Sequence, residues 1–274
     1  MKLLKFAIMT ITLTIMAAGV AAAKDPNKIV VDGSTTVGPI AKAFAEYYLA
    51  RHPEVNITVS ESGSGNGAKG LINAACDVAT MSRPMKNEEV KAAKDAGVLP
   101  IEHIVAMDGI AMVVHPSNPR ADITKEQISG IYTGGIKNWK ELGGPDQRIV
   151  AISRDTNSGT YETFETMVMN KQKLAERVEY VGSNGAIRQR VMSTPAAIGY
   201  VGLAFTEGVK ALTVAGIEAT GESVADKSYP ISRPLYMYTN GSPKEGTPLY
   251  EFINLSRTQD GKKIIEATGF VPAK

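Results

Sequence analysis

The sequence has few of the residues on which catalysis, metal binding and base stacking usually depend. Its 274 residues include one cysteine, three histidines and 6% aromatic residues. A single cysteine excludes an intramolecular disulfide, and the histidines and cysteine show no metal-ligand spacing. The 30 Lys and Arg residues nearly balance the 28 Asp and Glu residues, which excludes a broad basic surface for nucleic acid. We therefore expect no metal, no cofactor and no nucleic-acid partner.

The N-terminal segment has the layout of a secretory signal peptide. Lys2 and Lys5 precede an uncharged, mostly apolar run over residues 6–20, and alanines at 21–23 provide small residues for cleavage. The run is short for a bilayer span, which favours a cleaved segment over a permanent anchor. Cleavage after residue 23 would remove two lysines and take the formal net charge from +2 to zero. We expect a periplasmic protein.

Short strand-like runs alternate with helix-like runs in the rest of the chain. Apolar and alternating patterns predict strands at 29–31, 56–60, 78–81, 110–114, 148–153, 197–201, 212–214 and 236–238. Helical spacing predicts helices at 39–50, 68–75, 88–96, 158–170 and 186–193, a capped helix after Thr124, and two C-terminal helices. This order indicates an α/β fold, whose ligands are expected beyond the carboxyl ends of the strands.

Three segments share one design, in which a strand leads through a turn rich in Gly, Ser and Thr into a helix start. They cover residues 33–39 (GSTTVGP), 62–67 (SGSGNG) and 154–160 (RDTNSGT). Helix starts present unpaired N–H groups and the positive end of the helix dipole, and serine and threonine hydroxyls add donors. Any one of these turns is equally typical of a simple capped helix. Three of them together with Arg154 indicate an anion site, at which Asp155 is expected to point to solvent or to pair with a cation.

The same segments resemble those of periplasmic phosphate-binding proteins of phosphate ABC transporters. The likeness is carried by GSTT at 33–36, SGSGNG at 62–67, DVATMSRP at 77–84 and RDTNSGT at 154–160, and it extends over nearly the whole chain after residue 23. It implies no enzyme activity, inorganic phosphate as ligand, a membrane-embedded ABC permease as partner, and a monomer. The phosphate-binding residues it implies are Ser34, Thr35, Thr36, Ser64, Ser82, Arg154, Ser158, Gly159 and Thr160.

The resemblance also implies a type II-like architecture of two lobes with two crossover strands and a ligand cleft between them. On this basis residues 24–112 and 235–274 would form one lobe and residues 113–234 the other, with crossovers near residues 113–114 and 234–235. Independently of the resemblance, the Lys and Glu side chains at 86–96 predict a solvated helix face, which could serve as a docking surface for a permease. A ligand that touched both lobes would favour the closed form.

One position departs from the family pattern. Well-studied members carry an aspartate that accepts a hydrogen bond from protonated phosphate, and the DVATMSRP segment places Ser82 there. A carboxylate favours protonated phosphate over sulfate, whereas a hydroxyl can donate or accept. Selectivity against sulfate is therefore open at this stage. The neighbouring Arg83 is equally consistent with a second positive charge on the anion and with a structural salt bridge.

Other functions remain as alternatives. The site would suit sulfate or molybdate, and an ancestral phosphate site would also persist in a surface or matrix protein. Residues 65–70 match the G-x-G-x-x-G outline of an exported dinucleotide-dependent enzyme. A hydrolase is disfavoured because Ser64 lacks the G-x-S-x-G elbow, and because His52, His103 and His115 fit turns or a strand better than a catalytic role.

Overall fold

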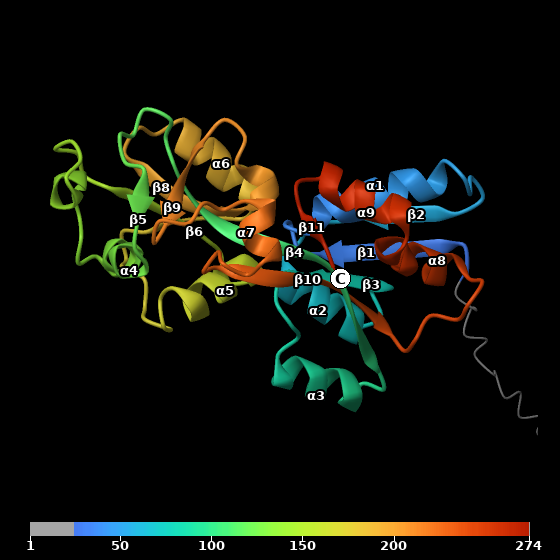
Figure 1. The fold of residues 1–274 in the computed structure, drawn as a ribbon. Coiled ribbons are helices and arrows are strands. Elements are labelled where there is room, and N and C mark those ends of the chain that lie inside the picture. Colours follow the sequence, from blue (N-terminus) through green and yellow to red (C-terminus); the bar gives the residue numbers. More distant parts are fainter. Residues whose placement is uncertain (1–24, 274) are drawn as a thin grey trace, which may run out of the picture.

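Two groups of elements lie side by side and are joined by two long strands, as Figure 1 shows. The structure is a computed structural model that describes residues 25–273, so the signal peptide expected at residues 1–23 lies outside the described part. The joining strands are β4 (Pro100–Val114) and β10 (Ser232–Asn240), which pair antiparallel with each other. The chain thus has the two-lobed α/β architecture expected from its sequence.

The first lobe is built from both ends of the described chain. Its N-terminal part contains β1 (Lys28–Gly33), α1 (Gly38–Leu49), β2 (Asn56–Val59), α2 (Ser64–Ile72), β3 (Val78–Met81) and α3 (Asn87–Asp95). After β10 the chain returns through α8 (Pro248–Asn254), η3 (Leu255–Arg257), α9 (Gln259–Ala267) and β11 (Val271–Pro272). Helices α8 and α9 pack against α1, where Phe44 and Phe252 meet edge to face.

The second lobe is made by the chain between β4 and β10. It begins with β5 (Asp122–Ile123), α4 (Lys125–Thr133), η1 (Trp139–Leu142), β6 (Val150–Arg154) and α5 (Gly159–Met167). It continues with β7 (Glu179–Val181), α6 (Asn184–Met192), β8 (Ala197–Gly202), η2 (Leu203–Phe205), β9 (Lys210–Val214) and α7 (Gly221–Ala225). In Figure 1 these elements lie apart from β1–β3 and on the other side of the joining strands.

Hydrogen bonds connect the strands of both lobes through β4 and β10. The order along the main path is β2-β1-β3-β10-β4-β8-β6-β7. β1 is parallel to β2 and β3, and β6 is parallel to β7 and β8, so each lobe has the parallel pairs typical of α/β folds. Residues 100–109 of β4 pair with β10, and residues 110–114 pair with β8. This change of partner lies just before the crossover expected near residues 113–114, and the lobe boundaries remain a prediction.

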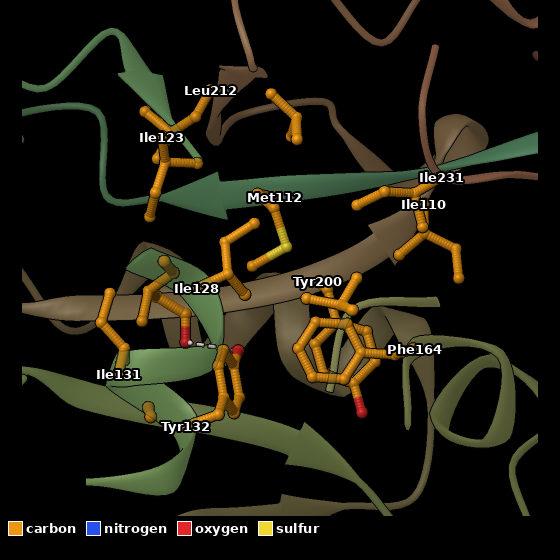
Figure 2. Close-up of a cluster of buried hydrophobic side chains, with 14 of the residues drawn as sticks. Ile110, Met112, Ile123, Ile128, Ile131, Tyr132, Phe164, Tyr200, Leu212 and Ile231 are labelled. Atoms are coloured by element: carbon orange, nitrogen blue, oxygen red, sulfur yellow. Dashed lines mark hydrogen bonds between the residues drawn. The ribbon is translucent and has the colours of Figure 1, made fainter. Parts of the chain in front are cut away.

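Each lobe has its own buried core. In the second lobe, Tyr132, Phe164 and Tyr200 are fully buried, and the rings of Phe164 and Tyr200 stack with centroids 4.0 Å apart (Figure 2). Trp139 is also fully buried, and its indole Nε1 donates to the carbonyl of Ala196 at 3.0 Å, so it is a packing residue of this core. In the first lobe Cys76 is 3% exposed and packs in an apolar cluster.

Local sequence signals account for most element boundaries. The side chain of Thr124 accepts from the amide of Gln127, and Gln127 reaches back to the Thr124 amide, so the predicted capping box opens α4. Pro39 lies in the first turn of α1. Apart from a strand around His103, the prediction missed residues 100–109 of β4 and the short elements β5, β7, α7 and β11, and it placed the start of α2 too late. These segments lack clear apolar periodicity, and the strands among them form by pairing with other strands.

Candidate functional site

The three glycine-rich turns come together where the two lobes meet. The first joins β1 to α1, the second joins β2 to α2, and the third joins β6 to α5. Thr36 of the first turn and Thr160 of the third have their hydroxyl oxygens 2.9 Å apart, although 124 positions separate them in sequence. The amide of Gly65 in the second turn donates to the carbonyl of Asn157 in the third at 3.0 Å. The turns therefore converge as expected for a single site.

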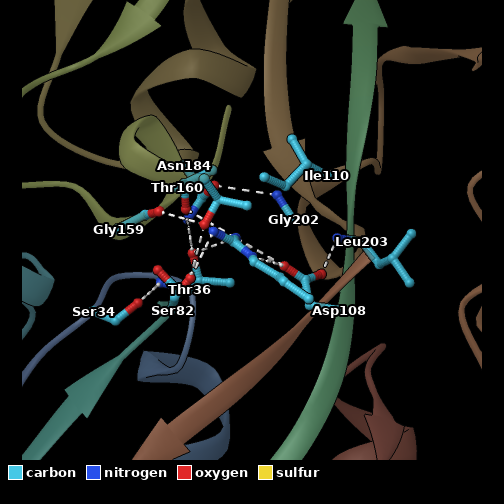
Figure 3. A network of polar contacts seen from close by, with 12 residues as sticks. Ser34, Thr36, Ser82, Asp108, Ile110, Gly159, Thr160, Asn184, Gly202 and Leu203 are labelled. Carbon is cyan, nitrogen blue, oxygen red and sulfur yellow. Dashed lines mark hydrogen bonds and ion pairs between the residues drawn. The ribbon is translucent and has the colours of Figure 1, made fainter. Parts of the chain in front are cut away.

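Ser82 joins this group from a fourth strand end. It follows β3 directly, and its hydroxyl oxygen lies 3.3 Å from that of Ser64. A Cβ atom built on Gly159 would lie 2.7 Å from the Ser82 Oγ and 2.5 Å from the Ser64 Oγ, so the start of α5 faces both serines. Figure 3 shows Ser82 and Thr36 facing Gly159 and Thr160.

All the predicted site residues are buried. The predicted serine, threonine and arginine residues are each at most 6% exposed. They are Ser34, Thr35, Thr36, Ser64, Ser82, Arg154, Ser158 and Thr160. Gly159 is buried at the first position of α5. Buried polar groups are stable only when they are hydrogen-bonded, so this concentration of hydroxyls marks a place built for a polar ligand or for mutual pairing. The structure thus brings every predicted residue to one junction, and their contact with a ligand remains a prediction.

Glycine is required where the turns bend most tightly. Gly33 has a φ of +135°, and a Cβ atom there would lie 2.2 Å from the carbonyl oxygen of Thr80. Gly63 has a φ of +103° as the residue before α2. Because a side chain is strained at these angles, glycine lets β1 and the α2 start approach β3 and α5 closely.

Arg154 is the positive group at the end of β6. It is 1% exposed, its Nη2 donates to the carbonyl of Gly182 at 2.9 Å, and its Nε has no hydrogen-bond partner among the described residues. Burial lowers the pKa of Arg154 to about 10, and the charge of Arg233 acts in the same direction. Asp155 opposes this shift, while its carboxylate accepts from the Asn157 amide at 2.9 Å. A buried guanidinium with an unpaired donor is well suited to an anion.

A second buried arginine lies at the same junction and was not predicted as a site residue. Arg233 of β10 is 3% exposed, and its cross-strand partner in β4 is the fully buried Asp108. Nε and Nη2 of Arg233 donate to the Asp108 carboxylate at 3.1 and 2.9 Å. Nη2 also donates to the Thr160 hydroxyl at 2.9 Å. Burial raises the pKa of Asp108, while the charge of Arg233 opposes that shift.

Asn184 is the third residue that sequence reasoning missed. It is fully buried at the start of α6, and its Nδ2 donates to the hydroxyls of Thr35 and Thr36 at 3.1 and 2.9 Å. The only available signal was its position just after Ser183, the N-cap of α6. The pairing of Asp108 with Arg233 had no local signal, because the two residues are 125 positions apart.

Arg83 takes the structural role left open by the sequence. Its guanidinium pairs with Glu89 at 2.7 Å and with Glu162 at 2.9 Å, and its Nη1 donates to the Pro84 carbonyl. Glu162 belongs to α5 in the second lobe, and Lys86 also pairs with it at 2.8 Å. Arg83 is therefore part of an ion-pair cluster that joins the lobes.

The features behind the enzyme alternatives lie elsewhere or take other roles. Gly65, Gly67 and Gly70 fall inside α2, not in a loop before it, so they do not form a dinucleotide-binding turn. His103 pairs with Thr239 and His115 with Ser117, both away from the site hydroxyls. Within residues 25–273, no group of three or more His, Cys, Asp or Glu side chains is placed to hold a metal. No helix in that range is long and apolar enough to cross a membrane.

Comparison with protein families identifies relatives over nearly the whole chain. The PBP superfamily domain matches residues 20–255. The phosphate-binding protein PstS of Bacillus subtilis (strain 168) is 33% identical over 253 residues, which cover 91% of this chain and 82% of that protein. The PstS of Borreliella burgdorferi is 31% identical over 264 residues, with 92% of each chain covered. The matched relatives are named as binding proteins.

Solved structures agree with these relatives. A Clostridium perfringens structure, described as a phosphate ABC transporter substrate-binding protein with bound phosphate, has a TM-score of 0.82 and 35% identity. The match covers 90% of this chain and all 100% of that one. An ABC-type phosphate transport receptor from Vibrio cholerae has a TM-score of 0.72 and 31% identity, with 89% of this chain and 99% of that one covered.

Proposed function

The chain belongs to the phosphate-binding proteins of the PBP superfamily, and from this premise we propose that it binds inorganic phosphate between its lobes and delivers it to an ABC permease for uptake. The chain's agreement with PstS relatives of similar length supports this function. The proposal assigns the contacts with phosphate to the hydroxyls of the three turns and Ser82, to the amides at the start of α5, and to Arg154.

The observation that carries the proposal is Arg154, which is buried at the end of β6 in the same turn that supplies Ser158 and Thr160. Its Nε has no hydrogen-bond partner among the described residues, whereas the second arginine at the junction is paired with a carboxylate. A buried guanidinium nitrogen without a hydrogen-bond partner is costly, and an anion is a ligand that would satisfy it. The starts of α1, α2 and α5 add backbone N–H groups and helix dipoles without adding formal charge.

Lobe closure follows from where these groups lie. Thr35, Thr36, Ser64 and Ser82 belong to elements of the first lobe, and Arg154 and Thr160 belong to the second. A phosphate held by both sets stabilises the closed arrangement through contacts that an open arrangement lacks. β4 and β10 are the joining strands, so hinge motion is assigned to them.

Export and delivery complete the proposed function. The signal-peptide pattern at residues 1–23 would bring the protein to the periplasm as a monomer. There it would bind phosphate without chemical change and present it to the permease in the closed form. This role requires no catalysis, in agreement with relatives named as binding proteins.

The test is isothermal titration of the purified protein and of Arg154→Met with phosphate. Loss of a charge-assisted hydrogen bond costs about 1.5–3 kcal/mol, and two such bonds from one guanidinium predict phosphate binding at least about 100-fold weaker. Arg148→Met is the matched control, because Arg148 is exposed just before β6. Unchanged affinity in Arg154→Met would refute the assigned site, and no phosphate binding by the wild type would refute the function.

A further inference from the structure

The hydroxyls at the junction differ in which hydrogen bonds they accept, and this difference sets what each can offer a ligand. A hydroxyl has one hydrogen to donate and two lone pairs to accept with. When a fixed N–H group donates to the oxygen, the hydroxyl hydrogen turns away from that donor. A buried hydroxyl whose oxygen accepts a hydrogen bond from an N–H group therefore points its own hydrogen toward an acceptor on its other side.

Asn184 donates hydrogen bonds to the two threonines of the first turn. Its Nδ2 donates to Thr35 Oγ1 at 3.1 Å and to Thr36 Oγ1 at 2.9 Å, so both amide hydrogens are used on hydroxyls. The orientation of the amide group is fixed, because its Oδ1 accepts from the Gly202 backbone amide at 3.2 Å. A flipped amide would place the Asn184 nitrogen against another donor. Figure 3 shows Asn184 between Gly202 and Thr36.

Arg233 donates a hydrogen bond to Thr160 of the third turn. Its Nη2 donates to Thr160 Oγ1 at 2.9 Å, and the same nitrogen lies 3.5 Å from Thr36 Oγ1. Arg233 is fixed by Asp108, whose other oxygen accepts from the Leu203 amide at 3.0 Å. The Thr36 and Thr160 hydroxyls are 2.9 Å apart, and only one of them can donate in that contact. At least one of the two hydrogens is therefore directed elsewhere.

Backbone amides donate hydrogen bonds to the hydroxyls of the site serines, with one exception. Ser34 accepts from the Thr36 amide, Ser64 from the Ser82 amide and Ser158 from the Tyr161 amide, at 3.1, 3.1 and 3.2 Å. Ser82 differs, because its hydroxyl forms a hydrogen bond with another hydroxyl, that of Ser64, at 3.3 Å. Ser82 is thus the site hydroxyl to which no N–H group of the described residues donates.

We propose that Asn184 and Arg233 are positioning residues that direct the Thr35 hydroxyl, and whichever of the Thr36 and Thr160 hydroxyls does not donate to the other, to donate to the anion. We propose also that Ser82 is left as the acceptor for the proton of hydrogen phosphate. This inference rests on the proposed function and deepens it. It assigns the selectivity for a protonated oxyanion to the absence of an N–H donor at Ser82.

The Asn184 part is tested with Asn184→Leu, which is close in shape and has no donor. Without the amide, the Thr35 and Thr36 hydroxyls are free to turn away from the anion, and we expect phosphate binding at least about 10-fold weaker by titration calorimetry. Asn254→Leu is the matched control, since the Asn254 amide donates to the Tyr250 carbonyl within α8 and to none of the site hydroxyls. Thermal melting of each variant shows that it is folded.

A double-mutant cycle separates positioning from a general structural effect. If Asn184 acts through the Thr36 hydroxyl, then Asn184→Leu weakens phosphate binding less in a Thr36→Val background, by at least about 3-fold. Additive effects, within about 2-fold, would overturn the positioning role. So would wild-type affinity in Asn184→Leu.

The Ser82 part is tested with Ser82→Ala and two anions. Removal of the proton acceptor is expected to weaken phosphate binding at least about 10-fold and to leave sulfate binding within about 3-fold, so the preference for phosphate falls. An equal loss for both anions would overturn the assignment of Ser82. A wild type that binds phosphate, combined with unaffected variants, overturns this inference alone, whereas a wild type that does not bind phosphate overturns the proposed function with it.

Discussion

A methyl group at Gly159 is expected to block phosphate binding without unfolding the protein. Gly159 is the first residue of α5, and its backbone does not have a positive φ. Alanine is favoured over glycine in a helix by about 1 kcal/mol, so the backbone at Gly159 tolerates the change. The space around the added methyl group, in contrast, is already occupied by neighbouring side chains. A Cβ atom at Gly159 would lie 2.5 Å from Ser64 Oγ and 2.7 Å from Ser82 Oγ, closer than real Cβ contacts.

The size of the effect follows from the two hydroxyls that must move. Both serines are almost fully buried and face α5, so a displaced hydroxyl loses its place beside the anion. A hydrogen bond to a charged group contributes about 1.5–3 kcal/mol, and 1.4 kcal/mol corresponds to a factor of 10 in affinity. Loss of one bond predicts about 10- to 100-fold weaker binding, and loss of both predicts at least about 100-fold.

Titration calorimetry with phosphate measures this loss, and thermal melting measures the stability of the fold. Gly185→Ala is the matched control, because a Cβ atom on Gly185 at the start of α6 would be 3.9 Å from Ser183 Oγ, an ordinary contact. We expect Gly185→Ala to bind as the wild type does. Phosphate affinity within about 3-fold of wild type in Gly159→Ala would refute the placement of the anion between α5 and the two serines.

Two further changes test the lobe contacts and the pH dependence of stability. Glu162→Gln weakens the ion pairs of Glu162 with Arg83 and Lys86 across the lobes. We expect about 3- to 10-fold weaker phosphate binding, with faster phosphate release in stopped-flow experiments. An unchanged release rate would contradict a role of these ion pairs in lobe closure. Burial lowers the pKa of His103 below its ordinary value of 6.5, and the charge of Arg257 acts in the same direction. The folded state then binds fewer protons than the unfolded state, so stability is complete above about pH 6.5 and falls as the pH drops through the lowered pKa. Melting between pH 7 and 5 should show a larger drop for the wild type than for His103→Gln, and equal drops would contradict this.

The sequence predicted the part of the fold that depends on local patterns. The runs at 29–31, 56–60 and 78–81 lie in β1–β3, and the helix at 39–50 corresponds to α1, because apolar periodicity and turn residues mark these elements locally. The long β4 was only partly predicted. In its residues 100–109 the apolar Ile104 is exposed and the charged Asp108 is buried, so the burial pattern does not follow the polarity of the side chains. The strand conformation of this stretch depends on pairing with β10, which lies more than a hundred residues later.

The candidate site shows the same division. Its glycine-rich turns, Ser82 and Arg154 have local signatures, and the structure places them together. Arg233 and Asp108 have none, and Asn184 has only its place after the N-cap Ser183, because each acts through a partner from a distant part of the chain. Sequence reasoning also left two roles open for Arg83, and its contacts with Glu89 and Glu162 show the structural one.

The charge balance of the chain has a related meaning. If residues 1–23 are removed as expected, the chain has no net charge and does not attract an anion through its overall field. At the junction, Asp108 pairs with Arg233, whereas the Arg154 guanidinium donates to the Gly182 carbonyl. Affinity is therefore expected to depend on local donors and to change little with salt.

Titration of the purified protein with phosphate and with sulfate in parallel tests the central claim most directly. The account predicts tight, saturable binding of one phosphate per chain, with sulfate at least about 10-fold weaker because Ser82 accepts a proton that sulfate lacks. Equal binding of sulfate and phosphate, or no binding of phosphate after removal of any copurified anion, would contradict it.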